Sequence, residues 1–161
     1  MRVAVITLSD SGYAGQRADL SGPAIGEMVE GRGWTVVHTA LLPDGRELLE
    51  AELRRLCDGG LADLILTTGG TGFSPTDVTP EATMAVVERP TPGIPEAMRY
   101  YSLQITPRAM LSRAAAGIRG RTLIVNLPGS PKAVRECLQA ILPALDHGLE
   151  ILKGTGGNCA R

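Results

Sequence analysis

Two acidic residues that follow apolar runs are the side chains of this 161-residue sequence with the clearest chemical potential. Asp44 comes shortly after the run 34–41, and Asp77 follows the run 63–68 and a glycine-rich loop. Carboxylates are hard oxygen ligands, so a pair of them beside phosphate groups suits Mg²⁺, and a carboxylate can also act as a general base. A Pro-Asp-Gly turn at Asp44 and a turn or helix cap at Asp77 are the structural alternatives.

The glycine-rich loop lies within residues 67–83, TTGGTGFSPTDVTPEAT. It lacks the Gly-Lys-Ser/Thr of a P-loop and the third glycine of a dinucleotide fingerprint. Closely spaced glycines and hydroxyls can form a concavity that binds anions and leads into a helix N-terminus. We therefore expect a phosphate or carbonyl cradle, and a flexible turn is the alternative. The candidate ligands are Thr68, Gly69, Gly70, Thr71 and Gly72.

Polar residues also follow the first and last apolar runs of strand length. Ser9 and Asp10 follow the run 2–8, and ordinary loop polarity is the alternative explanation for them. Ser130 is a reasonable helix N-cap, as are Ser21 and Thr79 before other helical patterns. The remaining candidates of the later segment are Asn126, Pro128 and Gly129.

Histidine and cysteine offer little chemistry in this sequence. His38 and His147 are isolated and have no cysteine or carboxylate partner at ligand spacing, which argues against a zinc site. The three cysteines include no CxxC pair, and an odd number does not make a disulfide framework. We therefore expect a reducing compartment, the cytoplasm.

The elements that position these residues alternate between strand and helix. Because the run 2–8 is β-branched and mostly apolar, it predicts a buried parallel strand, and three further runs predict strands. The pattern predicts a three-layer α/β/α fold with a mostly parallel, doubly wound sheet. The expected strands are 2–8, 34–41, 63–68 and 121–126, and the expected helices are 24–30, 46–57, 94–103, 132–152 and one that begins at Thr79.

This architecture brings the polar loops together. In doubly wound sheets, ligands bind beyond the carboxyl ends of the strands. The strand-to-helix loops should therefore share one edge of the sheet, and the carboxylates of Asp44 and Asp77 should both project there. These loops are 9–20, 42–45, 69–78 and 127–131.

Charge and hydropathy exclude several classes of protein. Sixteen basic and seventeen acidic residues give a net charge of −1, which argues against nucleic-acid coating and polybasic membrane binding. No apolar run approaches the roughly 18 residues of a membrane-spanning helix, and the N-terminus reads as a strand. Few aromatic residues predict an aliphatic core. The polar segment 154–161, which includes Cys159, predicts a mobile tail.

Seven motifs, in order along nearly the whole chain, resemble the Mog-type molybdopterin adenylyltransferases, a family that includes Mog, MoaB and the gephyrin G domain. The resemblance implies a single molybdopterin-binding domain over residues 1–153, transfer of AMP from Mg-ATP to the terminal phosphate of molybdopterin, and release of pyrophosphate. It also implies loop and strand over residues 109–120, where the residues alone leave helix open. The motifs are SDSG, DLSGP, LPD, TTGGTGFSPTDVTPEAT, PGIPEAM, ITPRAMLSRAAAGIRG and LIVNLPGSPKAVRECL.

The resemblance also assigns roles to single residues. Asp44 and Asp77 match the family's essential acids, and Ser102 and Ser112 match serines implicated in pterin binding. Thr76 stands where many relatives have Arg, so a cation is missing there. The implied partners are ATP, molybdopterin, two further copies in a homotrimer and the molybdenum-inserting enzyme of the pathway; nucleic acid and membrane are not expected.

Two other functions are compatible with these residues. A non-catalytic pterin-binding or scaffold protein of the same fold would bind molybdopterin without turnover. A nucleotide hydrolase would cleave ATP without any pterin. The absence of a serine–histidine or cysteine–histidine pair fits direct attack by a substrate phosphate in the adenylyl transfer.

Overall fold

A six-stranded sheet in the order β2-β1-β3-β6-β5-β4 forms the middle layer of the protein. The computed structural model describes residues 1–155. The first four strands in this order run parallel, β5 pairs antiparallel with β6, and β4 pairs antiparallel with β5, so the predicted mostly parallel sheet is confirmed. The strands are β1 (Arg2–Leu8), β2 (Thr35–Leu42), β3 (Leu64–Thr68), β4 (Arg89–Pro90), β5 (Ala116–Arg119) and β6 (Thr122–Leu127).

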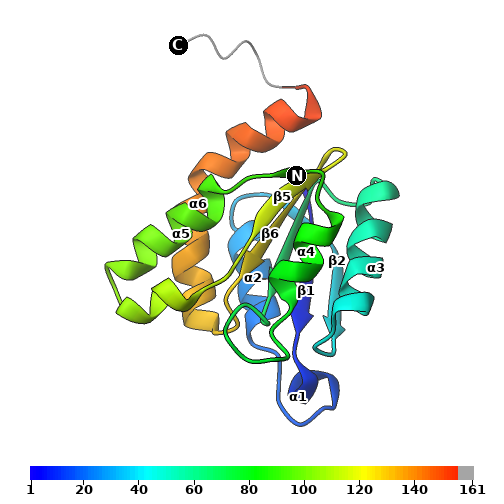
Figure 1. Cartoon of the computed structure of the whole chain (residues 1–161). Coiled ribbons are helices and arrows are strands. Elements are labelled where there is room, and N and C mark those ends of the chain that lie inside the picture. Colours follow the sequence, from blue (N-terminus) through cyan, green and yellow to red (C-terminus); the bar gives the residue numbers. More distant parts are fainter. Residues whose placement is uncertain (156–161) are drawn as a thin grey trace.

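Helices cover both faces of this sheet. α2, α5 and α6 pack on one face, and α3 and α4 pack on the other, as Figure 1 shows. None of the helices in residues 1–155 is long and apolar enough to cross a bilayer. The helices are α1 (Asp10–Tyr13), α2 (Ser21–Glu30), α3 (Arg46–Asp58), α4 (Thr79–Val86), α5 (Gly93–Leu103) and α6 (Pro131–Lys153), and a 3₁₀ turn spans Pro107–Leu111.

The two faces of the sheet bury separate aliphatic clusters. Alternate residues of each central strand point to opposite faces, so the strands are buried on both sides and their sequences show no polar alternation. In β3, for example, Leu64 and Leu66 join the cluster under α2 and α6, whereas Ile65 joins the cluster under α3 and α4. Trp34 is the one buried aromatic side chain among residues 1–155, which confirms the prediction of an aliphatic core.

The segment 109–120 is loop and strand, as the family resemblance implies. The 3₁₀ turn ends at Leu111 and β5 begins at Ala116. Gly117 of β5 packs against Val87, the residue that follows α4. A Cβ at position 117 would come within 2.7 Å of a methyl group of Val87. This close packing explains a glycine inside a strand.

Three helix starts differ in detail from the prediction or were not predicted. α1 occupies part of the expected loop 9–20, and it is capped by Ser9, whose hydroxyl accepts the N–H of Gly12 at 3.0 Å. Ser21 and Thr79 do not cap their helices, because α2 and α4 begin at these residues and their hydroxyls bind elsewhere.

The predicted tail begins with Gly154, which caps the C-terminus of α6. Residues 156–161, with Cys159, lie outside the described residues.

Asp63 joins both ends of the described chain to the start of β3. Its buried carboxylate accepts hydrogen bonds from the Arg2 backbone N–H at 2.8 Å, the Arg2 guanidinium at 2.9 Å and the Lys153 ammonium at 3.1 Å. Burial alone would raise the pKa of Asp63, but these donors outweigh it and lower the pKa from 3.8 to about 2. A lowered pKa means that the stabilisation is present above pH 3.8 and is lost as the pH falls from there towards 2.

We expect Asp63→Asn to lower the free energy of unfolding at pH 7 by roughly 2 kcal/mol, because the ionised form of Asp63 is the one that the donors stabilise. The variant should also lose less stability than the wild type between pH 4 and pH 3. Urea unfolding at both pH values and at pH 7 measures this. Asp58→Asn, which breaks an exposed ion pair with Arg119, is the control and should have a smaller effect. Equal pH dependence of wild type and Asp63→Asn would contradict the assignment.

Candidate active site

The carboxyl ends of β1, β3 and β6 lie side by side at one edge of the sheet. Thr7 of β1 pairs with Thr68 of β3, which pairs with Leu127 of β6. The chain winds from β1 outward to β2 and then returns to β3 on the other side, so the crevice expected of a doubly wound sheet falls between β1 and β3. In Figure 1, α1 and the green loop before α4 lie together at this lower end.

The glycine-rich loop folds back tightly over the end of β1. Gly69 and Gly70 have positive φ values of 96° and 65°. A Cβ on Gly69 would lie 2.3 Å from the Leu8 carbonyl oxygen, and one on Gly70 would lie 2.3 Å from Thr79 Oγ1. Thr79 donates its hydroxyl to the Gly69 carbonyl at 2.9 Å, which is why it does not cap α4. Glycine is therefore required here by backbone geometry as well as by any ligand.

Asp44 and Asp10 are joined by two reciprocal hydrogen bonds, each from a backbone N–H to the carboxylate of the other residue. The Asp44 N–H donates to the Asp10 carboxylate at 2.8 Å, and the Asp10 N–H donates to Asp44 Oδ2 at 3.2 Å. Burial raises the pKa of Asp44 above its ordinary value; the Asp10 N–H lowers it, and the negative charges of Asp10 and Asp77 raise it further. Asp44 thus lies at a bend between β2 and α3, where the charges of Asp10 and Asp77 add to its own negative charge and a cation would be stabilised.

Asp77 closes a turn of its own loop. Its Oδ2 accepts the Ser74 N–H at 2.9 Å, and a Cβ on Gly72 would lie 2.9 Å from the same oxygen. Within residues 1–155, the other oxygen of Asp77 and Oδ1 of Asp44 accept no hydrogen bond from the protein. The Thr76 hydroxyl shares a hydrogen bond with the Ser74 hydroxyl at 3.0 Å.

These two acids fit a magnesium ion that arrives with a nucleotide. No group of three or more histidine, cysteine or acidic side chains in the described part of the chain could form a metal cage. Mg²⁺ commonly takes one or two carboxylates, several waters and substrate phosphates, so a pair with free oxygens is sufficient. The pKa of Asp44 is raised mainly by burial and also by the charges of Asp10 and Asp77, and a bound cation would lower it.

Hydroxyl groups from the end of β3 and the start of α2 hold the turn at Pro128–Ser130 in place. Thr68 donates to the Pro128 carbonyl and Ser21 to the Gly129 carbonyl, each at 2.7 Å. Ser130 accepts the Ala133 N–H at 3.2 Å, so its predicted role as the cap of α6 is confirmed.

Asp19, not Ser21, receives the free N–H groups at the start of α2. Its Oδ1 accepts the N–H groups of Ser21 and Gly22 at 2.9 and 3.0 Å, and its Oδ2 accepts the Thr7 hydroxyl at 2.7 Å.

Asn126 lies behind the site. Its buried side-chain amide donates to the hydroxyls of Thr67 and Thr83 at 3.0 and 2.8 Å and accepts the Ala115 N–H at 3.1 Å. These bonds use the amide to join β3, α4 and β5, so the side chain faces the interior.

Two adjoining cavities of different character meet at Ser130. A polar cavity of about 330 Å³ contains the ends of β1 and β3, and an apolar cavity of about 470 Å³ lies between α5 and the turn before α6. Of the predicted residues, Ser9, Thr68, Gly69, Gly129 and Ser130 line the first, and Thr71, Gly72, Ser102, Ser112, Pro128 and Ser130 line the second. Asp10, Asp44, Gly70, Asp77 and Asn126 line neither.

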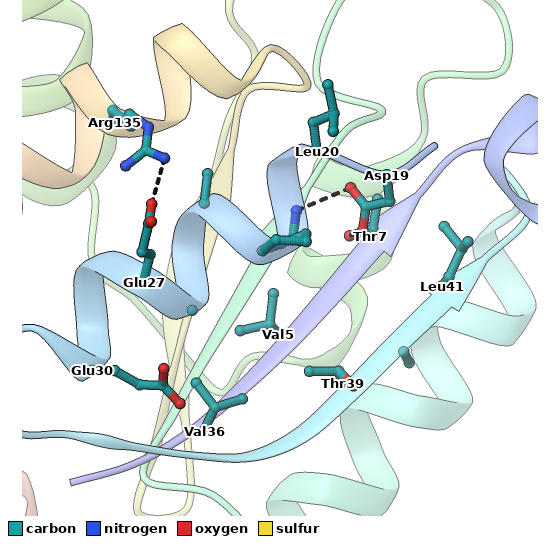
Figure 2. A pocket seen from close by; sticks show the side chains of 15 residues that line it. Val5, Thr7, Asp19, Leu20, Glu27, Glu30, Val36, Thr39, Leu41 and Arg135 are labelled. Atoms are coloured by element: carbon teal, nitrogen blue, oxygen red, sulfur yellow. Dashed lines mark hydrogen bonds and ion pairs between the residues drawn. The ribbon is translucent and has the colours of Figure 1, made fainter. Parts of the chain in front are cut away.

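A larger cavity, of about 760 Å³, lies beside this site, between α2 and the edge strand β2. Figure 2 shows Asp19 at one end of it and an ion pair of Glu27 with Arg135 on its rim. It shares Thr7, Asp19 and Leu20 with the polar cavity but contains neither Asp44 nor Asp77. None of the predicted site residues lines this larger cavity, whereas ten of them line the two smaller ones, so we place the candidate site at the smaller cavities, with Asp44 and Asp77 on neighbouring loops.

Comparison with known protein families shows which family the chain belongs to. A family profile described as "Probable molybdopterin binding domain" matches residues 4–147. The chain belongs to this family.

Individual members of the molybdopterin-binding family are similar over nearly the whole chain. A molybdopterin adenylyltransferase from Helicobacter pylori J99 is 42% identical over 96% of this chain and 89% of its own length. One from Escherichia coli K12 is 40% identical over 89% of this chain and 75% of its own. The crystal structure of the molybdopterin biosynthesis enzyme MoaB from Thermus thermophilus is 47% identical, with a TM-score of 0.91 over 98% of this chain and 99% of its own.

Three residues near the candidate site make contacts that the sequence did not predict. Asp19 accepts the first N–H groups of α2, and an acid two residues before a helix is a signal for such a cap. Arg17 lines the polar cavity, and Arg113 binds three acceptors around the Asp77 loop. The sequence around an arginine in a loop does not predict which acceptors its side chain will bind.

We expect Gly69→Ala to lower the free energy of unfolding by at least 1–3 kcal/mol, roughly the cost of forcing a side chain into a left-handed conformation, plus the collision with Leu8. Gly148→Ala is the control, because a Cβ at this position in α6 meets nothing within 4 Å and should stabilise the helix by up to about 1 kcal/mol. Urea unfolding of both variants measures the difference. A Gly69→Ala variant as stable as the wild type would contradict the described loop.

Proposed function

We propose that this protein is a molybdopterin adenylyltransferase that transfers AMP from Mg-ATP to the terminal phosphate of molybdopterin and releases pyrophosphate. The relatives from Helicobacter pylori and Escherichia coli that carry this name support the proposal. The observation that supports it most is that the loops at one sheet edge include those of Asp44 and Asp77 and also line a polar and an apolar cavity, which meet at Ser130.

The two cavities suit the two substrates. The polar cavity offers the Ser9 and Thr68 hydroxyls, glycine backbone and the Arg17 side chain, which in residues 1–155 has no bonding partner within the protein. An arginine fork suits phosphate oxygens, so Arg17 would supply the cation that Thr76 does not. The apolar cavity, with Met98 among its lining residues, has the surface for a flat heterocycle.

Ser102 and Ser112 give the apolar cavity its polar contacts. The Ser102 hydroxyl lies 3.7 Å from Cys137 Sγ, and the Ser112 hydroxyl accepts the Ala114 N–H at 3.3 Å. Each hydroxyl thus has further hydrogen-bonding capacity for the polar edge or phosphate of a pterin. Burial raises the pKa of Cys137, which keeps this thiol protonated at neutral pH.

The transfer needs positioning and charge stabilisation rather than a protein nucleophile. An oxygen of the molybdopterin phosphate would attack the α-phosphorus of ATP, and the bond to the leaving pyrophosphate would break. Asp44 and Asp77 would hold Mg²⁺, which, when bound, neutralises charge on the phosphate oxygens. The cradle of residues 69–72 and the turn 128–130 would orient the two phosphate groups at their meeting point beside Ser130.

A non-catalytic pterin-binding protein of the same fold is the second candidate. The apolar cavity with Ser102 and Ser112 would serve binding alone. A function of binding alone gives no reason for Asp44 to lie near the negative charges of Asp10 and Asp77. Burial and these charges raise the pKa of Asp44. This arrangement favours the adenylyltransferase.

Further properties of the family extend the proposal. A homotrimer, a cytoplasmic location and a handover of product to a molybdenum-inserting enzyme remain predictions from the resemblance. The proposed domain covers residues 1–153.

Pyrophosphate release from purified protein tests the function directly. We expect release when Mg-ATP and molybdopterin are both present, and none with either alone, since the pterin phosphate is the acceptor. Asp44→Asn and Asp77→Asn should each lower kcat by about 100-fold or more, because each removes a charged ligand while keeping the shape of the side chain.

The same assay separates the alternatives. ATP cleavage without pterin would identify a hydrolase, and tight pterin binding without turnover would identify a binding protein. Thermal unfolding of both asparagine variants is the control. If either variant unfolds instead of losing turnover at an unchanged melting temperature, the turn-forming role explains that acid.

A further inference from the structure

Arg113 reaches from the segment before β5 to the loop that carries Asp77. Its Nε donates to the Gly72 carbonyl at 2.7 Å, and its two terminal nitrogens donate to the Asp77 carbonyl and the Glu81 carboxylate. Its backbone N–H donates to the Thr71 carbonyl at 2.9 Å. One side chain therefore binds both ends of the loop 72–77 and the first turn of α4.

The segment around Arg113 is itself held in place. Arg99 of α5 donates to the carbonyls of Ser112 and Ala114 at 3.3 and 3.1 Å. Arg99, Ser112 and Ala114 also line the apolar cavity. The wall of the cavity proposed for the pterin is thus continuous, through Arg113, with the loop that carries a proposed metal ligand.

We propose that Arg113 is a positioning residue that sets the distance between Asp77 and the pterin cavity. The proposal rests on the proposed function and deepens it: Arg113 would fix one metal ligand relative to the acceptor substrate without touching either substrate. It lines neither of the two cavities in the part of the chain that the structure describes.

The chemistry of the guanidinium explains why an arginine does this. Its three nitrogens lie in one rigid plane and reach three acceptors in fixed directions, whereas an ammonium is a point charge on a flexible stem. Burial alone would raise the pKa of Glu81, but the hydrogen bond and the charge of Arg113 lower it, so the pair is ionised at neutral pH.

Small movements of the loop would reach the Asp77 carboxylate directly. Gly72, whose carbonyl Arg113 holds, packs against Asp77 Oδ2 so closely that a Cβ would lie 2.9 Å away. Displacing Gly72 therefore displaces Asp77. A misplacement of about 1 Å at a reacting centre can cost a rate on the order of 100-fold.

Steady-state kinetics of Arg113→Lys and Arg113→Ala test this role. We expect kcat to fall about 10- to 100-fold, the Mg²⁺ concentration for half-maximal rate to rise, and KM for molybdopterin to change by less than about twofold. Arg113→Lys should restore little of kcat, because it keeps the charge and loses the fork.

Arg119→Ala is the matched control. Arg119 also binds a carboxylate, Asp58, and a backbone carbonyl, that of Val86, but it joins α3, α4 and β5 away from the site. It should lower the melting temperature to an extent similar to Arg113→Ala and leave kcat and the Mg²⁺ dependence unchanged. Equal kinetic effects of the two variants, or a wild-type kcat in Arg113→Lys, would overturn the proposal.

Amide hydrogen exchange of residues 72–78 tests the same role without turnover. Exchange should be faster in Arg113→Lys than in the wild type and unchanged in Arg119→Ala. If the wild type shows no adenylyl transfer but exchange responds in this way, the proposed function fails and the positioning of the loop stands. Unchanged exchange in Arg113→Lys would overturn the positioning itself.

Discussion

The close approach of three backbone segments at the sheet edge is the constraint on which the site depends. Gly69 lies against the carbonyl at the end of β1, and Gly129 lies against Gly69, where its Cβ would be 3.5 Å from the Gly69 Cα. Side chains at position 69 would hold these strand ends apart. Because the loops after β1, β3 and β6 touch through bare backbone, the polar and apolar cavities can adjoin at Ser130.

Hydroxyl groups fasten the segments that the glycines allow to meet. Thr68, Thr79 and Ser21 each donate to a carbonyl oxygen of a neighbouring loop, at 2.7 to 2.9 Å. Buried carbonyls need such partners, and side-chain hydroxyls supply them where no ladder or helix can. Charged groups act further out: Arg113 holds the Asp77 loop, and Asp10 holds Asp44. The carboxylates thus stand on loops braced by the protein itself.

The central strands β1, β3 and β6 were predictable from the sequence because they are buried on both faces and read as nearly continuous apolar runs, whereas the edge strand β2 alternates exposed and half-buried residues. The convergence of Asp44 and Asp77 at one edge followed from parallel topology, and the raised pKa of Asp44, to which the charge of Asp77 contributes, agrees with it. The partners of the hydroxyls were not predictable, since Ser21 and Thr79 fit the pattern of a local cap as well as a distant contact. Asn126 lies near the end of a strand, where ligand-binding residues are expected, yet its side-chain amide forms its hydrogen bonds inside the protein. Local pattern shows which residues are polar, and tertiary contact decides what they bind.

The central claim is that Asp44 and Asp77 bind one metal ion between a nucleotide and a pterin. A crystal structure with Mn²⁺, a non-hydrolysable ATP analogue and molybdopterin tests it most directly, because Mn²⁺ can replace Mg²⁺ and gives an anomalous signal. We predict one anomalous peak within ligand distance of both carboxylates, the triphosphate in the polar cavity and the pterin in the apolar cavity. An ion bound away from either acid, or a nucleotide in the cavity of Ser102 and Ser112, would contradict the account.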